Sequence, residues 1–68
     1  MTKDKLIRIG TALYGERWQT DLAKALLMRD ARAIRQWLSG ERKIPVGLDV
    51  AIDVLIEEKI ETLNNIRT

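Results

Sequence analysis

Residues 19–38 read QTDLAKALLMRDARAIRQWL and contain two helical patterns separated by a short break. In the first pattern, Leu22 and Leu26 lie four residues apart, and Trp18 precedes them by the same interval. Side chains at this spacing share one face of an α-helix. The sequence therefore predicts a helix over residues 17–27 whose buried face carries these three apolar side chains.

The second pattern lies between a capping residue and a glycine. Asp30 precedes it, and an aspartate carboxylate can accept hydrogen bonds from the free backbone N–H groups at a helix start. Ile34 and Trp37 then recur at helical spacing, and Gly40 is placed to end the helix. We therefore expect a short helix over residues 31–39. The side chains on its opposite face are polar or basic: Arg32, Arg35, Gln36 and Ser39.

Two further helices are predicted on either side of this pair. Residues 3–14 carry apolar side chains at helical spacing, and Gly10 among them would permit another backbone to approach closely. Residues 48–66 are apolar over several turns, more than a three-helix core of this size can cover. The predicted fold class is therefore all-α, a small bundle of about four helices with a long C-terminal helix.

The composition limits both the size and the chemistry of the protein. Its 68 residues suffice for a single domain, residues 1–68, and a domain this short buries only about 60% of the surface of its unfolded chain. Since the chain has no cysteine and no histidine, it lacks disulfides, thiolate metal ligands and the commonest general base. The carboxylates fall at ordinary solvent-facing helical positions, so we expect no enzyme activity, cofactor, metal or small-molecule ligand.

Charge divides the chain at Pro45. Residues 1–45 hold ten cationic side chains against five anionic ones, whereas residues 46–68 hold two against five. The first part is suited to binding a polyanion and the second is not, although charges scattered for solubility alone are the alternative. No apolar run approaches the roughly 20 residues that cross a bilayer, and the first residues lack the apolar stretch of a signal peptide. We therefore expect a cytoplasmic protein.

The stretch from Gln19 onward resembles the phage-repressor and Cro-type helix-turn-helix superfamily of transcriptional regulators. In that family the first motif helix opens with a glutamine near a phosphate and carries a Leu-Ala pair for close packing. The recognition helix that follows has an aliphatic residue and a tryptophan on its core face. The positions that match these roles are Gln19, Leu22, Ala23, Leu26, Ile34 and Trp37. The resemblance covers residues 6–46 and extends to small regulators of phages and mobile elements, which implies a bacterial or phage-infected cell.

The turn between the two motif helices departs from the family pattern. The family usually has Gly-Val after the leucine, whereas Leu26 is followed here by Leu27 and Met28. The spacing from Leu22 to Ile34 is also one residue longer than usual. This turn must therefore form without glycine, the residue best suited to positive φ, and the assignment of single base contacts depends on its geometry.

The resemblance implies sequence-specific binding of double-stranded DNA in the major groove, with residues 1–45 as the DNA-binding core. Arginine can pair with guanine and glutamine with adenine, so the expected base contacts are Arg29, Arg32, Arg35 and Gln36. The expected phosphate contacts, which fix the register, are Gln19, Thr20, Ser39, Arg42 and Lys43. A solvated helix face is the alternative for these residues. Trp18 and Trp37 lie on apolar stripes, which favours core packing over stacking on bases.

The C-terminal helix, residues 46–68, is the expected partner surface. Two-fold dimers of such readers bind palindromic sites, so we expect a homodimer that acts as a repressor on a palindromic operator. The expected interface residues are Ile52, Ile56, Ile60 and Leu63. A monomer whose last helix folds back on its own core is the alternative to the dimer. A helical protein–protein interaction module without specific DNA binding is the alternative function.

Overall fold

Four α-helices and one short 3-10 helix make up residues 1–67, the part of the chain that the computed structural model describes. In chain order they are α1 (Lys3–Tyr14), the 3-10 helix η1 (Gly15–Arg17), α2 (Trp18–Ala25), α3 (Arg32–Ser39) and α4 (Leu48–Arg67). No strand occurs among these residues, which confirms the predicted all-α class with a long C-terminal helix. The helix predicted over residues 17–27 is shorter than expected, because Arg17 belongs to η1 and α2 ends at Ala25.

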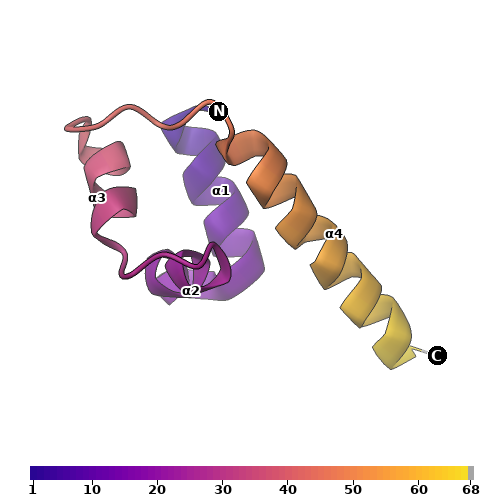
Figure 1. Ribbon diagram of the computed structural model, residues 1–68. Helices are drawn as coiled ribbons and strands as arrows, with labels where there is room; N and C mark the ends of the chain where they lie inside the picture. The colour runs from indigo at the N-terminus through magenta and orange to yellow at the C-terminus, as the bar shows by residue number, and fades with distance from the viewer. Residues whose placement is uncertain (68) are drawn as a thin grey trace.

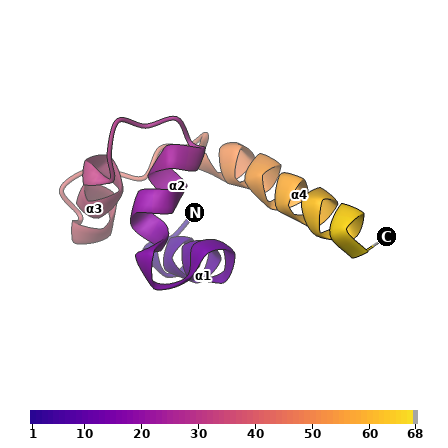
Figure 2. The same cartoon turned by 90° about the horizontal axis from the view of Figure 1, so that it is seen from below.

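The helices α3 and α4 lie on opposite sides of the pair formed by α1 and α2, in both views (Figure 1 and Figure 2). A single hydrophobic core joins all four helices. Its buried side chains are Leu6, Trp18, Leu22, Ala23, Ala31, Ile34, Trp37, Leu48 and Ile52. Trp18 and Trp37 are 5% and 7% exposed, so the prediction that both tryptophans pack in the core is confirmed. Burial of such large aromatic side chains supplies much of the apolar area that a domain of this size can hide.

Gly10 in the middle of α1 makes room for the indole of Trp18. A Cβ placed on Gly10 would overlap three ring atoms of Trp18, Cδ2, Cε3 and Cζ3. The sequence predicted a close approach of another backbone at this glycine; the structure corrects this, because the neighbour is a side chain. The contact fixes how closely α1 and the start of α2 approach each other.

The connection from α2 to α3 begins with a left-handed residue that is not glycine. Leu27 has φ 60° and is 93% exposed. The backbone N–H of Leu27 donates to the carbonyl of Lys24 at 3.1 Å, and that of Met28 donates to the carbonyl of Ala23 at 2.8 Å. These two bonds form a Schellman motif, which normally has glycine at the left-handed position. The helix-turn-helix regulators that the sequence resembles usually have glycine at the position of Leu27. The turn therefore reaches positive φ here without the residue best suited to it.

Replacing Leu27 with glycine is therefore expected to stabilise the protein by about 0.5–1 kcal/mol. The side chain contributes almost no buried area, whereas its Cβ strains the left-handed backbone. Urea denaturation followed by circular dichroism measures the change in the free energy of unfolding. Leu27→Ala is the matched control, because it removes the same exposed side chain and keeps the Cβ. Equal stability of the alanine and glycine variants would contradict the explanation.

Only the first turns of α4 pack on the core. Leu48 and Ile52 are buried there, whereas every residue of α4 from Glu57 to Arg67 is exposed. The helix therefore extends away from the other three (Figure 1), and the described residues span 44 × 21 × 21 Å. No helix within residues 1–67 combines the length and apolarity that crossing a membrane requires.

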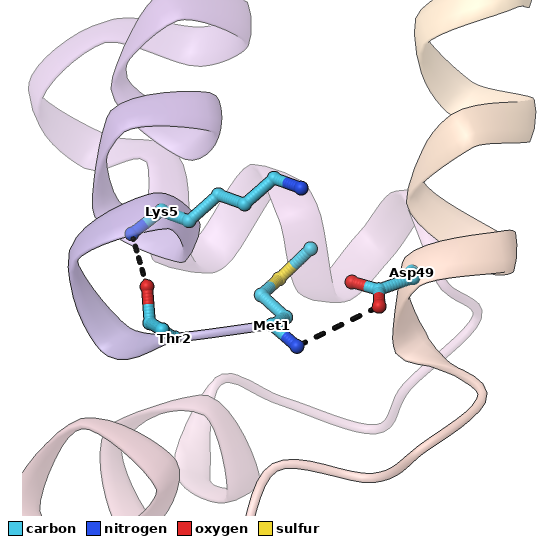
Figure 3. Close-up of polar contacts among 4 residues, drawn as sticks. All are labelled: Met1, Thr2, Lys5 and Asp49. Carbon is cyan, nitrogen blue, oxygen red and sulfur yellow. Dashed lines mark hydrogen bonds and ion pairs between the residues drawn. The ribbon is translucent and has the colours of Figure 1, made fainter.

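The start of α4 is held beside the start of α1 by an ion pair. The amino group of Met1 lies 3.5 Å from Oδ2 of Asp49 (Figure 3). Thr2 caps α1, since its Oγ1 accepts a hydrogen bond from the backbone N–H of Lys5 at 3.2 Å. The ion pair places the first residue of the chain beside the first turn of α4.

Candidate nucleic-acid interface

Local hydrogen bonds define both ends of α3. Oδ1 of Asp30 accepts a hydrogen bond from the backbone N–H of Arg32 at 2.9 Å. The carboxylate thus satisfies a free N–H at the helix start, as predicted, although the N-cap position itself is Ala31. At the other end, Gly40 adopts φ 88°, a left-handed conformation that suits glycine and ends the helix.

The two faces of α3 have opposite environments. Ile34 is fully buried and Trp37 is almost so. Arg32 and Arg35 are exposed on the other side, and Gln36 is partly exposed. The apolar face therefore anchors the helix in the core and leaves the long polar side chains free to reach a partner.

Two adjoining surface hollows run along the exposed side of α3. The first is lined by Arg32, Arg35, Gln36, Ser39 and Glu41. The second is lined by Arg29, Asp30, Arg32, Ala33, Gln36 and Arg42. Because Arg32 and Gln36 line both, the two hollows form one continuous surface, which we call the α3 surface.

The α3 surface is cationic and its cations are unpaired. It holds four arginines against two carboxylates, which lie just outside the two ends of α3. Within residues 1–67 the one ion pair joins Met1 to Asp49, so none of these four arginines has a carboxylate oxygen within 4 Å. Guanidinium groups without a carboxylate partner offer forked N–H donors to phosphate oxygens or to base edges, and two of the four, Arg32 and Arg35, lie on α3 itself.

Gln36 and Arg42 are joined by a hydrogen bond that the sequence did not predict. Nη1 of Arg42 donates to Oε1 of Gln36 at 3.4 Å, and the backbone N–H of Arg42 donates to the carbonyl of Gln36 at 3.2 Å. Reading adenine requires both the amide oxygen and the amide nitrogen of a glutamine. The amide oxygen has a second lone pair, so Gln36 can accept a hydrogen bond from adenine while it keeps the bond to Arg42.

Ser39 is occupied by its own helix end. Its hydroxyl donates to the carbonyl of Gln36 at 3.2 Å and accepts from the backbone N–H of Glu41 at 3.4 Å. A phosphate contact by this hydroxyl would require it to give up the bond to Gln36. The bond to Gln36 is a local contact of the kind that serine often makes within a helix, whereas the bond from Glu41 depends on how the chain turns at Gly40.

The α3 surface brings together six of the nine side chains expected at DNA: Arg29, Arg32, Arg35, Gln36, Ser39 and Arg42. The other three lie apart from the hollows that define it. Gln19 and Thr20 are in the first turn of α2, where Gln19 is partly exposed and Thr20 is exposed. Lys43 lines a third hollow beyond α3, which adjoins the α3 surface at Arg42.

The residues expected at a dimer interface divide into two groups. Ile52 is fully buried in the core of its own chain, which corrects its assignment, because such a side chain is not available to a partner. Ile56 is partly buried, whereas Ile60 and Leu63 are 53% and 50% exposed on the continuation of the same helix face.

Comparisons of the chain with protein-family models, with curated proteins and with solved structures found no match.

Proposed function

We propose that this protein binds double-stranded DNA sequence-specifically, with α3 as a recognition helix in the major groove and α2 as the supporting helix of a helix-turn-helix. The observation that carries the proposal is the cluster of four arginines without carboxylate partners on and beside the face of α3 opposite its buried Ile34 and Trp37. A major groove about 12 Å wide admits an α-helix, and forked guanidinium donors match guanine O6 and N7. The opposite position of α4 leaves this face uncovered (Figure 1).

The contacts divide into two kinds. Arg32 and Arg35 lie on the helix itself and read bases, and Arg29 lies just before its first turn. Gln36 joins them as a partner for adenine. Arg42 binds a phosphate, because a charge-assisted hydrogen bond to phosphate is stronger than its 3.4 Å bond to the amide oxygen of Gln36. The first turn of α2, with Gln19 and Thr20, supplies backbone N–H groups and side chains to a second phosphate.

A salt series on DNA binding tests the function. The probe is a labelled duplex selected from random DNA by the protein itself, and fluorescence anisotropy measures the affinity. Neutralising about four or five phosphates should give a slope of log affinity against log salt of about −4. A selected duplex should bind at least about 1,000-fold more tightly than an unrelated one. Absence of binding at low salt would contradict the proposal and favour an interaction module for proteins.

We further propose that the protein acts as a homodimeric repressor on a palindromic operator. The exposed half of α4 supports this, because Ile60 and Leu63 continue the face that Leu48 and Ile52 bury in the core. Two copies packed through this stripe would hide it and keep the acidic side chains of α4 at the rim, away from DNA. Sedimentation should show a dimer, and a monomer at high micromolar concentration would contradict this part.

A further inference from the structure

A third hollow lies beyond the C-terminal end of α3, where three separate segments of the chain meet. It is lined by Lys3 from α1, by Gly40, and by Arg42 and Lys43 from the loop that follows. Nζ of Lys3 lies 3.3 Å from the point where a Cβ on Gly40 would stand, so the ammonium group sits directly over the end of α3. Residues forty positions apart in the sequence thus place three cations around one hollow.

This hollow continues the α3 surface. Arg42 lines both the third hollow and the one that contains Arg29 and Arg32, so the two hollows adjoin at this residue. Lys3, Arg42 and Lys43 are all exposed, and none of them has a carboxylate oxygen within 4 Å among residues 1–67. Three positive charges around one hollow repel one another, and an anion bound between them would reduce that repulsion.

We propose that Lys3, together with Arg42 and Lys43, binds a backbone phosphate of the DNA whose major groove α3 enters. This inference rests on the proposed function and adds Lys3, a residue of α1, to the contacts. The position favours a phosphate over a base, since the hollow lies past the last turn of α3 rather than on its exposed face. Lysine ammonium groups suit a phosphate because they act as point charges and need no planar partner.

The contact complements the one proposed at the start of α2. A recognition helix that is held by phosphates at one end only can tilt in the groove, whereas contacts on both sides fix its register. Lys3 is also well placed to interact with the free carbonyl groups at the C-terminal end of α3. A purely structural role of this kind would affect the melting temperature and leave the salt dependence of DNA binding unchanged.

The experiment compares Lys3→Gln with the wild-type protein on the selected duplex and on an unrelated duplex, over a salt series. We expect the magnitude of the slope of log affinity against log salt to fall by about 0.9, with the same loss of affinity on both duplexes. Lys24→Gln is the matched control, because it removes the same charge from the exposed surface of α2 away from the three hollows. Lys3→Arg should keep the wild-type slope.

The outcomes separate this inference from the proposed function. If the wild-type protein binds DNA and Lys3→Gln has the same slope of log affinity against log salt as Lys24→Gln, the role of Lys3 is overturned. The DNA-binding proposal then still stands. A lower melting temperature of Lys3→Gln with an unchanged slope would assign Lys3 to the end of α3 alone. Failure of the wild-type protein to bind any duplex at low salt would overturn both.

Discussion

Replacing Gly10 with alanine is expected to destabilise the protein by about 1–2 kcal/mol, although the same change stabilises most helices. Glycine inside a helix is usually about 0.5–1 kcal/mol less favourable than alanine, which would predict a gain. Here the added methyl group would overlap the indole of Trp18 at three ring atoms. Trp18 is 5% exposed and enclosed by the core, so it cannot move without displacing its neighbours. Overpacking of this kind costs about 1–3 kcal/mol and exceeds the gain in helix propensity.

Urea denaturation monitored by circular dichroism measures this loss. Gly47→Ala is the matched control, because no atom lies within 4 Å of the added methyl group and the backbone there lacks positive φ. That variant should be neutral or more stable by up to about 1 kcal/mol. In a Trp18→Leu background, Gly10→Ala should lose most of its effect, since the ring that it meets is gone. An increase in the stability of Gly10→Ala alone would refute the contact.

Local spacing was sufficient to predict the four α-helices and most of the side chains that they bury, but it did not predict η1, and Leu26 lies beyond α2 and is only partly buried. Residues 3–14 form a helix with the predicted bounds, and Ile34 and Trp37 are buried, because a period of 3.6 residues is a property of the chain itself. The contact between Gly10 and Trp18 could not be predicted, since it depends on how two helices meet. The same is true of Ile52, whose burial depends on where α4 leaves the core.

The candidate site shows the same division between local pattern and tertiary arrangement. The spacing of Arg32, Arg35 and Gln36 placed them on one exposed face, which the structure confirms. The bond between Gln36 and Arg42, and the position of Lys3 over the end of α3, depend on the path of the loop after Gly40. Periodicity carries no information about such a loop, so the sequence identified the cationic helix without the contacts that surround it.

Replacing Arg35 with alanine is expected to weaken binding to the selected duplex by about 1–3 kcal/mol, a loss of roughly 5- to 150-fold. Arg35 lies in the middle of α3, is exposed, and has no carboxylate oxygen within 4 Å among residues 1–67. Its guanidinium is therefore free to make a bidentate contact to guanine. The loss should be concentrated at one base pair, so that a selection repeated with the variant relaxes at that position alone.

Lys43→Ala is the contrasting variant, because it removes a predicted phosphate contact instead of a predicted base contact. Lys43 lies in the hollow beyond α3, so its loss should weaken all duplexes alike and lower the magnitude of the salt slope by about 0.9. Arg35→Ala removes a positive charge as well, but its effect should depend on the duplex because a base edge differs between sequences and a phosphate does not. If both variants weaken binding to selected and unrelated duplexes equally, α3 contacts only the phosphate backbone of the DNA and does not recognise bases. Specificity would then require another surface of the protein.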